Sequence, residues 1–174
     1  MKKLVALVAV LATTALGAIA LAAPATGQGR PTAPSPNLVD TAIAANAAGD
    51  FDVLLCLVTK YPDLVATLSQ RGQLTVFAPT DAAFARIGLT EANCAEFQAA
   101  NAETVKNILA YHVTVGRRDA ASVVGSTRIR MLNGQFAEVT SSGGSAFIDG
   151  AEILVTDVKA TNGIIHVVGG VLLP

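Results

Sequence analysis

The segment TNGIIHVVGGVLLP, residues 161–174, combines a turn signal, an apolar run and one histidine. The Asn162-Gly163 pair is typical of a tight turn, and the β-branched residues that follow predict a strand. Successive side chains of a strand point to opposite faces, and the residues around His166 are apolar on both faces. We therefore expect a strand that is buried on both sides.

His166 is either a working residue or a core residue. A buried imidazole without a hydrogen-bond partner costs about 1–3 kcal/mol, so a core histidine should be neutral and bonded to backbone or to a nearby side chain. A hydrolase would need a nucleophile, a histidine and an orienting acid in contact. The chain has two histidines, His112 and His166, and no Gly-x-Ser-x-Gly motif. We therefore predict a core histidine and no enzyme activity.

The sequence also carries no pattern typical of a metal or cofactor site. Neither histidine has a second potential ligand at the short spacing that zinc sites use. Asp149 and Glu152 flank a turn, but no Asp-rich calcium loop accompanies them. We expect no metal and no cofactor.

The remaining pattern changes halfway along the chain from helical to extended. Helices preceding a series of sequential strands indicate an α+β fold, mostly helical in its N-terminal half, with a largely antiparallel sheet. The helical stretches are 38–48, 51–60, 64–70, 82–88, 90–100 and 102–112, and the extended ones are 74–79, 128–132, 135–140, 145–149, 153–160 and 164–173.

The N-terminus reads as an export signal followed by a spacer. Two lysines precede an uncharged apolar run with an Ala-rich exit, which predicts a signal peptide over 1–25. An uncleaved membrane anchor is the alternative, because the run is nearly long enough to span a bilayer. Residues 26–36 are rich in Pro, Gly, Ser and Thr and predict a flexible spacer. One domain is expected over 37–174, secreted, periplasmic or at the cell surface.

The charge of the chain argues against one class of partner, and its cysteine content favours a disulfide. Without its first 25 residues the chain keeps ten basic and thirteen acidic residues, a net charge of about −3 that argues against nucleic-acid binding. Outside the cytoplasm two cysteines favour a disulfide, here between Cys56 and Cys94, and free buried thiols are the alternative. Closing a loop of about 39 residues would stabilise the fold by up to about 4 kcal/mol.

Three segments together resemble the fasciclin domain. They are LTVFAPTDAAF at 74–84, ILAYHVTVG at 108–116, and ILVTDVKATNGIIHVVGGVLLP at 153–174, in the family's order and spacing. The resemblance implies a wedge-shaped β-sandwich with helices packed on it, and a small single-domain secreted bacterial member of a family of extracellular adhesion proteins. One position departs from the family pattern, since Gly169 stands where relatives often carry an acid.

The first signature segment has a physical interpretation. Phe77 belongs to a strand whose pairing Pro79 ends, and Phe84 lies on the inner face of the following helix. Thr80 and Asp81 are expected to cap that helix. The structural signature residues are therefore Phe77, Pro79, Thr80, Asp81, Phe84, Asn162, Gly163 and His166.

The Tyr-His segment supplies the candidate binding residues. In adhesive relatives this segment is implicated in partner binding, which makes Tyr111 and His112 candidates, with Arg117 and Arg118 as a polar rim. The alternative is structural, with the tyrosine ring in the core and the imidazole bonded to nearby backbone. Adjacent helical side chains point about 100° apart, so the two rings cannot face one partner squarely.

The sequence thus favours a secreted, non-enzymatic module for adhesion or extracellular interaction. Its partner would be a cell-surface or extracellular-matrix protein or a polysaccharide. The alternative is a small-molecule or lipid carrier with an apolar cleft between helices and sheet.

Overall fold

The computed structural model describes residues 36–46 and 49–174. The predicted signal peptide and nearly all of the predicted spacer lie outside these residues. Within the described part, no helix has the length and apolar character that crossing a membrane requires.

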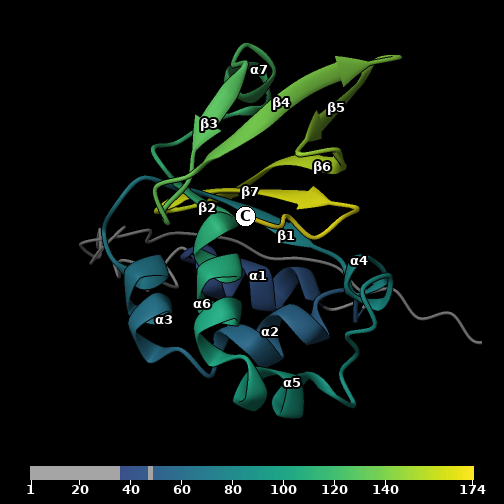
Figure 1. The fold of residues 1–174 in the computed structure, drawn as a ribbon. Coiled ribbons are helices and arrows are strands. Elements are labelled where there is room, and N and C mark those ends of the chain that lie inside the picture. The colour runs from purple at the N-terminus through teal and green to yellow at the C-terminus, as the bar shows by residue number, and fades with distance from the viewer. Residues whose placement is uncertain (1–35, 47–48) are drawn as a thin grey trace, which may run out of the picture. The chain divides into compact units, whose positions relative to one another are not determined.

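Most helices of the described part come before the series of later strands, as the sequence pattern indicates, but a short helix at Ala120–Val124, which the pattern does not predict, lies among the strands (Figure 1). Asn37 begins the first helix, because its side chain accepts hydrogen bonds from the N–H groups of Val39 and Asp40. The helices are α1 (Leu38–Ala45), α2 (Asp52–Val58), α3 (Pro62–Ser69), α4 (Asp81–Ala85), α5 (Cys94–Ala100), α6 (Ala102–Tyr111) and α7 (Ala120–Val124).

The strands form one sheet in the order β2-β1-β7-β6-β5-β4-β3, and neighbouring strands are antiparallel except β1 and β7, which are parallel. The sheet almost closes on itself, because the N–H of Leu132 after β3 donates to the carbonyl of Val113 in β2 at 2.7 Å. The α+β expectation is confirmed. The strands are β1 (Leu74–Pro79), β2 (Val113–Val115), β3 (Arg128–Arg130), β4 (Phe136–Ser142), β5 (Ser145–Ile148), β6 (Ala151–Ala160) and β7 (Gly163–Val168).

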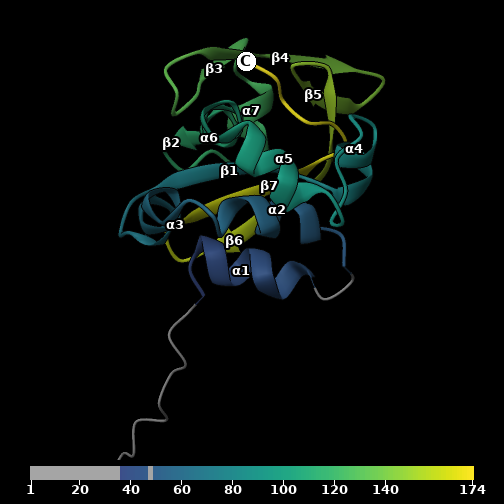
Figure 2. The same ribbon diagram turned by 60° about the horizontal axis from the view of Figure 1, so that its bottom comes forward.

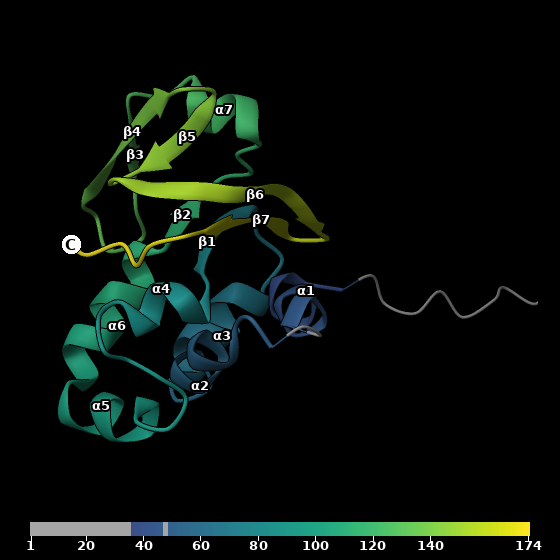
Figure 3. The same cartoon turned by 90° about the vertical axis from the view of Figure 1, so that its right-hand side faces the viewer.

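Two hydrophobic cores lie on opposite faces of β7, which is buried over its whole length as predicted. Ile165 and Val167 pack against the helices, whereas Val168 belongs to the core between the two halves of the sheet. Figures 2 and 3 show the arrangement, with α1, α2 and α3 on the helical side of β1 and β7 and with β3, β4 and β5 on the other side. The central strand is therefore the shared wall of both cores.

Asn162 and Gly163 join β6 to β7 and fasten this turn to the helices. The Asn162 carboxamide accepts from the N–H of Leu38 at 2.8 Å and donates to the carbonyls of Leu68 at 2.7 Å and Gln70 at 2.9 Å. A Cβ at position 163 would collide with the backbone carbonyl of Leu74. Glycine is required here by close approach of two backbones.

One predicted cap is wrong. Thr80 caps α4 as expected, accepting from the N–H of Ala83 at 3.3 Å. Asp81 instead accepts from the N–H groups of Asp52 and Val53, both at 3.0 Å, and so caps the start of α2. The orphan N–H groups of α2 lack a cap from their own segment, because Phe51 holds the N-cap position.

The predicted disulfide is confirmed, since Cys56 and Cys94 are bonded to each other. The bridge joins α2 to the start of α5, and Cys94 is 2% exposed. It therefore cross-links two helices that pack against each other.

The close approach at Gly163 generates a prediction. We expect Gly163→Ala to lower the free energy of unfolding by at least about 1–3 kcal/mol, because the obstructing atom is backbone and cannot rotate away. Gly72→Ala is the matched control, since a Cβ there meets no atom within 4 Å. Urea unfolding of both variants measures the difference, and equal stabilities would contradict the packing argument.

Candidate functional site

Tyr111 lies at the end of α6 and points into the core between the sheet halves. It is 4% exposed, and its hydroxyl donates to Asp149 Oδ2 at 2.5 Å, with the carbonyl of Phe136 at 3.2 Å. Burial and the hydrogen bond to the Asp149 carboxylate raise the pKa of Tyr111 well above its ordinary value. The other Asp149 oxygen accepts from the N–H of Glu138 at 2.7 Å, so the tyrosine ties α6 to the β4–β5 hairpin.

His112 caps the C-terminal end of the same helix and is also buried, at 3% exposure. Its Nδ1 lies 2.8 Å from the carbonyl of Ile108, and its Nε2 accepts from the N–H of Leu172 at 3.0 Å. A carbonyl can only accept, so these partners assign the proton to Nδ1. Burial lowers the pKa of His112 to about 4, which keeps the ring neutral at pH 7.

His166 in β7 also joins two backbone groups through its ring, but here Nε2 is the donor and Nδ1 is the acceptor. Its Nε2 lies 2.9 Å from the carbonyl of Arg118, and its Nδ1 accepts from the N–H of Asp157 at 3.3 Å. The ring is fully buried and stacks against Phe77, with the centroids 5.6 Å apart. His166 is thus a core residue whose two ring nitrogens bind backbone groups of two other segments.

The loop after β2 is held against the sheet by these contacts. The N–H of Arg118 donates to Thr75 Oγ1 at 2.9 Å, and the Asp157 carboxylate accepts from the N–H of Ala120 at 3.0 Å. Asp157 itself has a positive φ of 60° within an irregular part of β6. Arg117 is exposed and Arg118 is half-buried, with its Nε atom buried and lacking a hydrogen-bond partner in the described chain.

The four candidate residues are therefore not one exposed patch. Tyr111 and His112 enter different cores, as their angular separation on the helix predicts, and only the arginines reach the surface. Direct contact of a partner with Tyr111 or His112 stays a prediction. The geometry supports the structural alternative, in which the tyrosine ring packs in the core and the imidazole bonds to backbone.

Sequence reasoning missed an exposed arginine and phenylalanine pair on the outer face of β3 and β4. The guanidinium carbon of Arg128 lies 4.8 Å from the centroid of the Phe136 ring, within the range of a cation–π contact. Arg130 lies directly opposite Phe136 in the strand register. The alternation in Arg-Ile-Arg and Phe-Ala-Glu was the available signal, but it does not reveal which face is outward.

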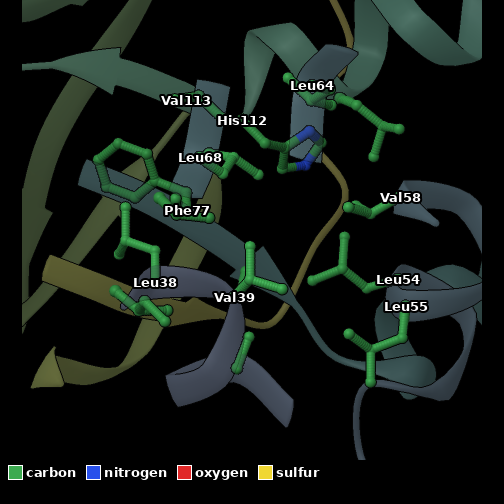
Figure 4. A pocket seen from close by; sticks show the side chains of 15 residues that line it. Leu38, Val39, Leu54, Leu55, Val58, Leu64, Leu68, Phe77, His112 and Val113 are labelled. Atoms are coloured by element: carbon green, nitrogen blue, oxygen red, sulfur yellow. The ribbon is translucent and has the colours of Figure 1, made fainter. Parts of the chain in front are cut away.

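An apolar cavity lies between the helices and β1, where the carrier alternative expects a cleft. Figure 4 shows leucine and valine side chains around it, with the ring of His112 at its edge. Its volume is about 50 Å³. Pockets for drug-sized ligands measure roughly 300–1,000 Å³, so this space is several times too small for such a molecule.

Gly169 lies at the surface end of β7, beside two side chains. Arg86 Nη1 donates to its carbonyl at 2.9 Å, so this arginine reaches residue 169 through the backbone. A Cβ at this position would meet Leu154 at 3.4 Å, close to ordinary contact. Across residues 36–46 and 49–174, no three His, Cys, Asp or Glu side chains are grouped closely enough to hold a metal ion.

The low pKa of His112 makes stability depend on pH. The unfolded chain binds a proton near pH 6.5, whereas the folded chain does so near pH 4, so stability falls as the pH drops through this window. We expect a loss of about 2 kcal/mol between pH 7 and pH 5, measured by urea unfolding. Aspartate and glutamate ordinarily have pKa values of about 3.9 and 4.3, below the pH 5–7 range of this comparison.

His112→Asn is the control for this pH effect, because it removes the titrating ring and keeps an amide that can bond to backbone. Its unfolding free energy should change less between pH 7 and pH 5 than that of the wild type. Parallel pH profiles of the two proteins would contradict the assignment to His112.

Comparison with known proteins places this geometry in a family. Residues 49–174 match the sequence profile of the fasciclin domain. Protein sll1483 of Synechocystis sp. is 38% identical over 132 residues, which are 74% of this chain and 71% of that protein. Immunogenic protein MPB70 of Mycobacterium bovis is 35% identical over 112 residues, 64% of this chain and 55% of its own length.

The fold has a counterpart among solved structures. A FAS1 domain pair from the insect cell adhesion molecule fasciclin I superposes with a TM-score of 0.65 at 20% identity, over 81% of this chain and 52% of that chain. This likeness concerns the fold, while the profile match covers well over half of the sequence. The chain therefore belongs to the fasciclin domain family.

Proposed function

We propose that this chain is an extracellular, non-enzymatic interaction module that holds a cell-surface or extracellular-matrix partner. Recognition would take place on its exposed loops and sheet face, with no bond made or broken. The predicted signal peptide would deliver the domain to the cell surface, the periplasm or the medium.

The observation that carries this proposal is the use of both histidines. Every ring nitrogen of His112 and His166 is already bonded to backbone, and both rings are buried. Neither ring is available to activate a nucleophile, because a general base must reach the proton that it removes. The chemistry that remains is contact by surface residues.

The similar proteins also support an interaction function. The solved domain pair comes from a cell adhesion molecule, and its fold resembles that of this chain. This chain spans only about half the length of that protein and of MPB70, so the proposal does not extend to the partners of those whole proteins. What is carried over is a rigid domain that presents loops.

A carrier function is the second candidate, and the apolar cavity is the observation in its favour. The cavity, at about 50 Å³, would have to expand several-fold to hold a lipid chain. Expansion would separate α1, α2 and α3 from β1 and expose the larger core. This cost places the carrier function behind the interaction function.

We assign the loop after β2 to the interaction surface. Arg117 is exposed on this loop, and Arg118 is anchored by its backbone to β1 and to His166. His166, Thr75 and Asp157 would act as positioning residues for this loop, since they bond to the backbone of Arg118 and Ala120. A rigid, pre-organised loop loses less conformational entropy on binding.

An adhesion assay tests the proposal. Beads coated with the full chain are incubated with layers of whole cells of the producing organism, and retention under flow is counted. We expect wild-type beads to be retained and Arg117→Glu beads to be retained several-fold less, because the variant reverses an exposed charge. Lys60→Glu is the matched control, because it gives the same net charge at an exposed lysine in the turn that follows α2.

Retention of wild-type beads no better than that of albumin-coated beads would contradict the interaction function. Equal loss in Arg117→Glu and Lys60→Glu would move the surface away from the loop. Native mass spectrometry of the purified chain tests the carrier function, which requires a co-purified ligand.

A further inference from the structure

The positive charge of the chain is concentrated in one segment. Nine basic residues lie beyond residue 36, and four of them fall within residues 113–137 together with a single acid, Asp119. The chain as a whole carries a formal net charge of −1. The segment 113–137 is therefore basic on an otherwise acidic protein, and the next residue, Glu138 of β4, is an exposed acid opposite Arg128.

Arg128, Arg130 and Phe136 form the exposed centre of this segment, and we call them the β3–β4 face. All three side chains are exposed, with Phe136 at 52%, while Ile129 and Ala137 between them point into the core and are fully buried. Thr114 Oγ1 donates to the carbonyl of Arg130 at 2.7 Å, which places the face beside β2, three residues before Arg117. The face is thus continuous in structure with the proposed interaction loop.

The arginines of this face form no salt bridge with another residue that the structure describes. Glu138 lies directly opposite Arg128 in the register, yet Arg128 packs over the Phe136 ring. Among the residues that the structure describes, no carboxylate lies within 4.0 Å of the charged nitrogens of Arg128 or Arg130. Both guanidinium groups keep N–H donors that can bind a carboxylate in bidentate fashion.

We infer that the β3–β4 face binds an acidic polypeptide segment that also carries an apolar side chain. The inference rests on the proposed interaction function and names the partner chemistry. Arginine and aromatic residues together are the residue types most enriched at protein–protein contacts. Glutamate or aspartate of the partner would pair with Arg128 and Arg130, and its apolar side chain would cover Phe136.

The arrangement of the phenylalanine favours a polypeptide over an acidic polysaccharide. A sugar ring stacks on an open aromatic face, and the Arg128 guanidinium already lies over the Phe136 ring. The rest of the exposed ring fits the side of an aliphatic or aromatic side chain. Stacking also holds Arg128 in place before binding, which reduces the entropy lost on association.

A titration with a synthetic peptide tests the inference. The full chain is titrated with a twelve-residue peptide of Glu-Glu-Leu repeats by isothermal calorimetry at 25 mM and 300 mM NaCl. We expect binding at low salt that weakens at high salt, and at least tenfold weaker binding by the Arg128→Glu/Arg130→Glu double variant. Phe136→Ser should weaken binding several-fold and leave its salt dependence unchanged.

The matched control is Lys60→Glu/Lys159→Glu, which has the same net charge as the arginine double variant and changes two exposed lysines elsewhere. It should bind the peptide within twofold of wild type. Circular dichroism and melting curves establish that each variant folds. We expect every variant to fold, because the substituted side chains are exposed.

Three results would overturn the inference. The first is that the wild type does not bind the peptide, and the second is that both double variants lose binding equally. The third is that polygalacturonate binds through Arg128 and Arg130 while the peptide does not bind. The titration needs no cell layer, so its failure is separable from failure of the adhesion assay. Peptide binding through this face without adhesion would leave the inference standing and remove the proposed function.

Discussion

Two buried imidazoles, each bonded to backbone on both nitrogens, hold the domain together where its parts meet. A neutral imidazole offers one donor and one acceptor, so it can satisfy one carbonyl and one N–H of segments that are not neighbours in sequence. His166 joins β7 to the irregular part of β6 and to the loop after β2. His112 joins the end of α6 to Leu172 near the end of the chain. Each bridge works only while the ring is uncharged, since a second proton would face another donor.

The signature residues have a structural role for the same reason: their polar atoms already form hydrogen bonds within the fold. Polar side-chain atoms of Asp81, Asn162 and both histidines bond to backbone groups. The Tyr111 hydroxyl bonds to the Asp149 carboxylate. An unsatisfied buried polar group costs about 1–3 kcal/mol, so these residues stabilise a unique arrangement by having every partner in place. Under the proposed interaction function, recognition falls to exposed residues, which we assign to β3, β4 and the loop after β2.

The sequence predicts most elements of this fold but misses the short strand β2 and the short helix α7, and it predicts fewer of the contacts between elements. The final strand, its turn and its burial on both faces follow from local alternation around His166, which needs no knowledge of the partner strands. The parallel pairing of β1 with β7 cannot be derived this way, because it depends on segments about 90 residues apart. Asp81 illustrates the limit, since its position favours a local cap and its actual partner is the start of α2. For the candidate site, the sequence identifies the Tyr-His segment but does not decide whether its rings are buried. The outward face of the Arg128–Phe136 hairpin follows only from the three-dimensional structure.

Long-range ¹H–¹⁵N correlation spectra of the histidine side chains test the central claim most directly. At pH 7 we expect two neutral rings in opposite tautomers, with the proton on Nδ1 of His112 and on Nε2 of His166. The His112→Asn variant assigns the two sets of signals. A shared tautomer, averaged shifts from rapid exchange between tautomers, or an imidazolium at either position would contradict the account.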